Sequence, residues 1–153
     1  MTNKSDPKRS QTNRTGWVLL LPSSDRWASA IGLAAEQEQV AIKQLADVDD
    51  LLESAGWYQP CVIVVDVSET PPAVLNRFLT TTESPVFKSP LFALGNNDLR
   101  DARLDLIQLG FAELFVSTAE TKRLIRMANR FFRDAERVSY SIEELVARDL
   151  PWG

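Results

Sequence analysis

The chain of 153 residues has no histidine, a single cysteine and no long apolar run. The absence of histidine excludes catalytic triads, imidazole acid–base catalysis and histidine metal sites. Cys61 alone cannot form an internal disulfide or a CxxC metal site, which favours a reducing compartment. The longest aliphatic runs, 18–21 and 62–65, fall far short of the roughly 20 residues that span a bilayer. We therefore expect a cytoplasmic protein with no membrane contact and little catalytic equipment.

The charge distribution separates the first residues from the rest of the chain. The net charge is −4 and the pI is about 4.9, which argues against general affinity for nucleic acid. Residues 1–15 are nevertheless basic and hold no aliphatic or aromatic side chain after Met1. Such a segment cannot bury enough surface to offset its ordering entropy, so it is predicted to be a flexible tail without an apolar signal-peptide region.

From residue 16 onward, short apolar runs alternate with helical periodicity. The predicted strands are 17–21, 39–45, 61–65, 90–94 and 112–116, with 61–65 at the sheet centre and 39–45 at an edge. The predicted helices cover about 25–35, 48–55, 73–79, 99–107 and 119–137. Five βα units of this size predict an α/β flavodoxin-like (CheY-like) three-layer αβα sandwich. Its five-stranded parallel sheet would have the order 2-1-3-4-5.

Four stretches at the predicted strand ends resemble the receiver domains of two-component response regulators. They are VLLLPSSD, CVIVVD, PLFALGNN and LGFAELFVSTAETKRLIRMANRFF. The resemblance covers about residues 16–136 and implies a receiver-like domain over 16–137. In that family, strand one ends in an acidic pair that binds magnesium, and strand three ends in the aspartate that accepts a phosphoryl group. Strand four ends in Ser or Thr, and strand five ends in Lys-Pro.

The chain departs from this pattern where the chemistry of the family takes place. Only Asp66 matches, at the position of the phosphoacceptor. Pro22 and Ser23 stand in place of the acidic pair, Gly95 in place of the hydroxyl, and Ser117 in place of the lysine. Phosphoryl transfer needs positioning and charge neutralisation, and magnesium prefers several oxygen ligands. With Asp25 as the nearest additional acid, we expect a degenerate pocket that holds no metal or other cofactor.

Most of these residues also have a purely structural explanation. Ser117 and Glu120 have the spacing of a capping box for the last helix. Asp66 fits a strand-end acid that is hydrogen-bonded to nearby backbone amides. Cys61 lies within the central strand, where a buried structural thiol is expected.

Two surfaces are candidates for binding a partner. The last helix carries Arg123, Arg126 and Arg130 within a net charge of +3, which fits either a solvated face or a binding face. The resemblance implies a homodimer through the fourth helix, the fifth strand and the fifth helix. Residues 138–153 form a C-terminal extension in which Ser141 and Glu144 predict a short helix, followed by Trp152. This extension either folds back over a groove, which we favour, or docks on another protein.

The leading hypothesis is a non-enzymatic pseudo-receiver that signals through contacts with protein partners. An atypical response regulator phosphorylated on Asp66 is the first alternative, with Asp25 or Ser23 and water completing a magnesium shell. A small flavodoxin-like ligand-binding protein is the second alternative. The loop 22–25 lacks the glycine of a phosphate cradle, which disfavours it.

Overall fold

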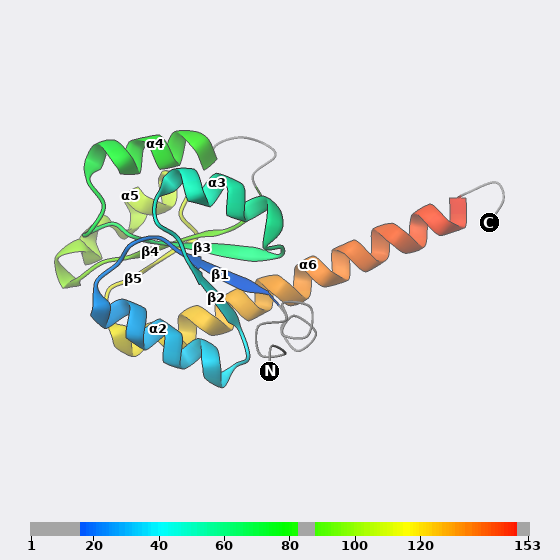
Figure 1. Cartoon of the computed structure of the whole chain (residues 1–153), viewed down its shortest axis with the longest axis horizontal. Coiled ribbons are helices and arrows are strands. Elements are labelled where there is room, and N and C mark those ends of the chain that lie inside the picture. The colour runs from blue at the N-terminus through cyan, green and yellow to red at the C-terminus, as the bar shows by residue number, and fades with distance from the viewer. Residues whose placement is uncertain (1–15, 83–87, 150–153) are drawn as a thin grey trace, which may run out of the picture.

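The computed structural model describes residues 16–82 and 88–149 and contains one parallel sheet with helices on both faces (Figure 1). The strand order is β2-β1-β3-β4-β5, as the sequence predicts. The strands are β1 (Trp17–Leu20), β2 (Ala41–Gln44), β3 (Cys61–Asp66), β4 (Leu91–Leu94) and β5 (Glu113–Phe115). The helices are α2 (Asp25–Gln37), α3 (Val48–Trp57), α4 (Pro72–Thr82), η2 (Asn97–Ala102), α5 (Arg103–Gln108), η3 (Thr118–Glu120) and α6 (Thr121–Asp149).

Strand β3 lies at the centre because both of its faces are apolar. All six of its residues are buried, and it pairs with β1 from Trp17↔Cys61 onward and with β4 from Ile63↔Leu91 onward. Strand β2 lies at the edge, where three of its four residues are partly or fully exposed. The predicted central and edge strands are therefore both confirmed.

Each face of the sheet has its own apolar core. Helices α2 and α6 cover one face, where Ile31, Leu124 and Phe132 are almost completely buried. Helices α3, α4 and α5 cover the other face, together with Leu51 and Phe78. Figure 1 shows these two layers on opposite sides of the strands. This arrangement leaves the loops that follow the strands at one edge of the sheet.

Polar side chains fix the starts of the helices, largely where the sequence places them. Ser24 caps α2 by accepting a hydrogen bond from the Trp27 N–H, and Asp47 caps α3. Helix α3 runs two residues past the predicted range 48–55, because it includes Gly56 and ends at Trp57. Gly110 follows α5 with a φ of 116°, a backbone conformation that glycine adopts without strain.

The C-terminal extension does not form a separate helix, in contrast to the sequence expectation. Helix α6 is continuous over 29 residues, and the Ser141–Glu144 pair lies inside it and begins no new element. Neither Pro nor Gly interrupts 121–149, so nothing in the sequence terminates the helix there. Figure 1 shows the end of α6 (orange to red) extending past the sheet, so residues 138–149 do not fold back over a groove. The tail 1–15 and Trp152 lie outside the described residues.

Candidate functional site

The carboxylate of Asp66, at the end of β3, is fully buried and accepts hydrogen bonds from two loops. Its Oδ2 accepts from the backbone N–H of Ser24 at 3.3 Å. Its Oδ1 accepts from the backbone N–H and the hydroxyl of Ser68 at 3.1 and 2.5 Å. The exposed fraction of Asp66 is 0%. The side chain therefore joins the loop after β1 to the loop after β3, and neither of its oxygens faces solvent.

The loop after β1 provides no second carboxylate where receiver domains have their acidic pair. Pro22 is exposed, and the Ser23 hydroxyl donates to the Ser24 carbonyl at 3.4 Å. Asp25 lies exposed in the first turn of α2. No group of three or more Cys, Asp or Glu side chains in the described ranges is arranged to hold a metal ion. A lone acid whose oxygens are already hydrogen-bonded does not fit magnesium, which takes several oxygen ligands in an octahedral shell.

At the end of β4, Gly95 carries no side chain, and the space next to its Cα is taken by the tip of the Leu99 side chain. A Cβ atom at this position would lie 2.6 Å from Cδ1 of Leu99. The Gly95 carbonyl accepts a hydrogen bond from Nε1 of the buried Trp27 at 3.3 Å. Position 95 therefore offers no hydroxyl, and its backbone carbonyl is engaged by the Trp27 indole.

After β5, Ser117 begins a helix and does not provide a cation. Its hydroxyl accepts from the Ala119 N–H at 3.2 Å, while Oε2 of Glu120 accepts from the N–H groups of Val116 and Ser117. This arrangement confirms the predicted capping box. Burial alone would raise the pKa of Glu120. The backbone hydrogen bonds and the Arg123 guanidinium outweigh it and lower that pKa below its ordinary value.

Ser68 and Arg26 are among the residues of this site that sequence reasoning missed. Ser68 lies two positions after Asp66, which is the spacing of an Asx-turn and could have been recognised. Arg26 contributes to a small cavity of about 130 Å³ next to the loops. This cavity is lined by Ser24, Arg26, Trp27, Ser68, Glu69, Gly95, Asn96, Val116 and Thr118. Nothing in the local pattern around Arg26 indicates its place in the cavity, because apart from Ser24 and Trp27 the lining residues come from loops distant in sequence.

A separate charged face joins α5, β5 and α6. The Glu113 carboxylate pairs with Arg103 at 2.7 Å and with Arg123 at 3.3 Å, and these contacts lower its pKa to about 2. The Arg123 guanidinium also lies 4.6 Å from the centre of the Phe115 ring. Arg126 and Arg130 are exposed and form no ion pair with other described residues. Arg123 thus differs from Arg126 and Arg130, because only Arg123 of these three forms ion pairs with described residues.

The single cysteine is a structural thiol, as the sequence predicts. Cys61 is fully buried, and its Sγ lies 3.1 Å from the Ser89 hydroxyl. Burial raises the pKa of the thiol, and the contact with Ser89 only partly opposes this effect. Cys61 therefore stays in its protonated form, which is the unreactive one.

No protein-family model matches the sequence, and no curated protein resembles it closely in sequence. Solved structures do resemble the fold. The signal receiver domain of a putative LuxO repressor protein from Vibrio parahaemolyticus shares 16% identity at a TM-score of 0.63, over 80% of this chain and 96% of that one. The chemotaxis response regulator CheY4 of Vibrio cholerae shares 14% identity at a TM-score of 0.59, over 73% and 97%.

A third similar structure is the beryllofluoride-activated NtrC4 receiver domain dimer, with 17% identity, a TM-score of 0.60, and coverage of 76% of this chain and 98% of that one. At these identities the likeness defines the fold. The chain has the flavodoxin-like fold of response-regulator receiver domains, with the same five-stranded parallel sheet. No helix within the described ranges is both long and apolar enough to cross a membrane.

Proposed function

We propose that the chain is a pseudo-receiver: a non-enzymatic signalling module that works through protein contacts and takes no phosphoryl group or cofactor. One observation carries this proposal. The only acid that matches the receiver motif, Asp66, is fully buried, and both of its oxygens accept hydrogen bonds from the chain itself. A phosphodonor would have to displace the Ser24 and Ser68 donors before it could reach the carboxylate.

The neighbouring positions support the same proposal through electrostatics. A phosphoryl group attached to Asp66 would add negative charge next to a buried site. Charge at such a site is costly unless cations or donors balance it. Gly95 and Ser117 supply neither the hydroxyl nor the lysine that perform this task in receiver domains. The single buried thiol fits the reducing cytoplasm, where we propose that the protein acts.

The test is phosphorylation of the full chain by acetyl phosphate, or its mimicry by beryllofluoride, each in the presence of magnesium. Intact mass and backbone amide spectra are followed for the wild type and for Asp66→Asn. We expect no covalent adduct and no magnesium-dependent change in the amides around Asp66. Stoichiometric modification that Asp66→Asn abolishes would establish the alternative, an atypical response regulator phosphorylated on this residue.

We further propose that two copies of the chain associate through α5, β5 and α6. Three exposed apolar side chains lie on or next to α5, namely Leu104, Ile107 and Leu109, and α5 also carries Arg103, which pairs with Glu113. Sedimentation equilibrium should show a dimer for the wild type and a monomer for Leu104→Glu. Leu33→Glu, at an equally exposed site on α2, should remain dimeric. A wild type that stays monomeric at all concentrations would contradict this part of the proposal.

A further inference from the structure

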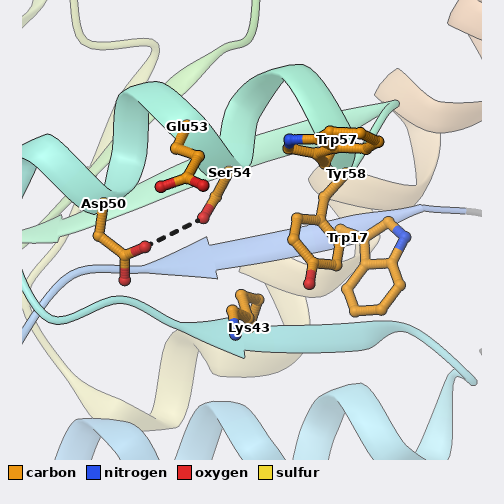
Figure 2. A pocket seen from close by; sticks show the side chains of 7 residues that line it. All are labelled: Trp17, Lys43, Asp50, Glu53, Ser54, Trp57 and Tyr58. Carbon is orange, nitrogen blue, oxygen red and sulfur yellow. Dashed lines mark hydrogen bonds between the residues drawn. The ribbon is translucent and has the colours of Figure 1, made fainter.

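A second pocket, of about 440 Å³, lies between α3 and the edge strand β2 and shares no residue with the Asp66 site (Figure 2). It is lined by Trp17, Lys43, Asp50, Glu53, Ser54, Trp57 and Tyr58. Trp17 is the first residue of β1, whereas Asp66 is the last residue of β3. The Trp17 end of the pocket therefore lies at the edge of the sheet opposite to Asp66.

One face of α3 forms a wall of this pocket. Asp50, Glu53, Ser54 and Trp57 have the i, i+3, i+4, i+7 spacing that places side chains on one side of a helix. This face differs from the apolar stripe that includes Leu51 and packs into the core. In Figure 2 the polar face points across the pocket towards the strands. A helix face that combines two carboxylates with an indole, and that no other helix covers in this view, is a candidate binding surface.

The strands supply the opposite wall. Successive side chains of a strand alternate between faces, so Trp17 and Leu19 lie on the α3 side of the sheet. Lys43 pairs with Leu19 in register and joins them there. The Trp17 and Tyr58 rings meet edge to face, with their centres 4.5 Å apart. Trp57 is 80% exposed, an unusual state for so large an apolar side chain.

The pocket already holds one cation against an aromatic ring. Nζ of Lys43 lies 5.8 Å from the centre of the Tyr58 ring. The Asp50 carboxylate is partly engaged, because it accepts from the Ala46 N–H at 3.0 Å and from the Ser54 hydroxyl at 3.4 Å. Glu53 is exposed and has no hydrogen bond or ion pair with other described residues. With Lys43 counted, the lining carries a net formal charge of −1.

We propose that this pocket binds an arginine side chain presented by a partner polypeptide. A guanidinium is planar and stacks on an aromatic face such as that of Trp57, while its fork of donors matches a carboxylate such as that of Glu53. The incoming cation competes with Lys43 for the space next to Tyr58. The assignment rests on the proposed function only in that a protein is the ligand, and it requires nothing of Asp66.

The test titrates the full chain with the peptide acetyl-Gly-Ser-Arg-Ser-Gly-amide. The control peptide carries citrulline, which is neutral and nearly the same shape, in place of arginine. The readout is the indole N–H resonances of Trp17 and Trp57, with the buried Trp27 indole as an internal reference. We expect a saturable shift at Trp17 and Trp57 with the arginine peptide alone, and no shift at Trp27.

Three variants and one matched control sharpen the outcome. Glu53→Gln and Trp57→Ala should each weaken binding by about twofold to fivefold, as expected for an exposed ion pair or cation–π contact. Lys43→Gln should tighten binding, because it removes the competing cation. Glu36→Gln, which neutralises an exposed acid on α2, should leave binding unchanged. Equal binding of the citrulline peptide, or equal effects of Glu53→Gln and Glu36→Gln, would overturn the proposal.

A fifth variant tests whether the occupant comes from the chain itself. The basic residues Lys4, Lys8, Arg9 and Arg14 precede Trp17 closely in sequence. If their replacement by Gln shifts the Trp57 indole without added peptide, the occupant is this segment and the assignment to a partner is wrong. The phosphodonor experiment reports only on Asp66, so its failure and the failure of this titration are distinguishable.

Discussion

Asp66 stabilises the fold in the same position where a receiver domain would carry out phosphoryl transfer. Its side chain is fully buried, and its two oxygens accept from the N–H groups of the half-buried Ser24 and the exposed Ser68. A buried donor left without an acceptor costs free energy close to its full desolvation. Under the proposed function, this carboxylate has a structural role, because it links the loop after β1 to the loop after β3.

The first prediction concerns this carboxylate. Asp66→Ala removes the acceptor of both N–H groups and should lower the free energy of unfolding by about 1–2 kcal/mol, because Ser24 is partly shielded from water whereas the exposed Ser68 can bond to solvent. Ser68→Ala removes a single hydroxyl donor and should lower it by about 1 kcal/mol. Urea denaturation measures both values, with Glu36→Ala as an exposed-acid control. If Asp66→Ala matched Glu36→Ala, the carboxylate would have no structural role.

Glycine at residue 16 allows β1 and α6 to come together. A Cβ atom at Gly16 would lie 2.4–2.6 Å from ring atoms of Phe132, itself 1% exposed in the core. Ring and backbone cannot both keep their positions if that atom is added, because protein interiors are close-packed. Gly32, within α2, has nothing within 4 Å of the corresponding atom.

These two glycines should therefore respond in opposite directions. Gly16→Ala should destabilise the protein by about 1–3 kcal/mol through overpacking against Phe132. Gly32→Ala should stabilise it by about 0.5–1 kcal/mol, because alanine is the better residue inside a helix. Thermal or urea unfolding of both variants checks the contrast. Equal effects would mean that the close approach of Gly16 to Phe132 does not restrict the residue at position 16.

At the scale of elements, the Glu113 ion pairs join α5, β5 and α6, and the charge on Glu113 makes this link pH-dependent. The pKa of Glu113 is lowered from 4.5 to about 2. The largest cause is the hydrogen bond from Arg103, and the Leu114 N–H, the charge of Arg103 and the hydrogen bond from Arg123 add to it, whereas burial acts in the opposite direction. A carboxyl with a lowered pKa contributes stability that is fully present above its unfolded pKa. That stability is lost as the pH falls through the folded pKa.

The third prediction follows from the lowered pKa of Glu113. Glu113→Gln should lower the free energy of unfolding by up to about 1 kcal/mol near neutral pH, because both arginine partners are partly exposed and solvent screens them. The difference from the wild type should stay constant above about pH 5 and shrink between about pH 4.5 and 2. Urea midpoints at neutral pH and at several acidic values provide the measurement. A difference that grew towards acid would show that another group is responsible.

Some elements were predictable from sequence because local chemistry alone determines them. The β-branched run of β3 and the Ser117–Glu120 box each specify one structure, whatever surrounds them. The continuity of α6 was not predictable in this way, because Ser141 and Glu144 are compatible with both a helix start and a helix interior. The pocket beside α3 was also missed, because Trp17 reaches it from a strand far away in sequence and Lys43 from the edge strand.

At the scale of the whole molecule, α6 has two parts with different surroundings. From Leu124 to Phe132 its apolar residues pack on the sheet as part of one core. Beyond this region Figure 1 shows the helix continuing past the strands, with no other described element beside its last turns. The stability of the domain and the presence of the extension should therefore be separable.

The fourth prediction tests this separation. A chain that ends after residue 135 retains every α6 residue that the core includes among the side chains the structure describes, so its free energy of unfolding should stay within about 0.5 kcal/mol of the full chain. Phe132→Ala, in contrast, should cost about 3–5 kcal/mol, because it leaves a cavity between α6 and β1. Urea denaturation of both variants, with amide spectra to compare the sheet, provides the measurement. A large loss of unfolding free energy on truncation would show that residues 136–153 contribute to the core. An unchanged unfolding free energy would mean that the end of α6 is not needed for the fold and is available for contacts with other molecules.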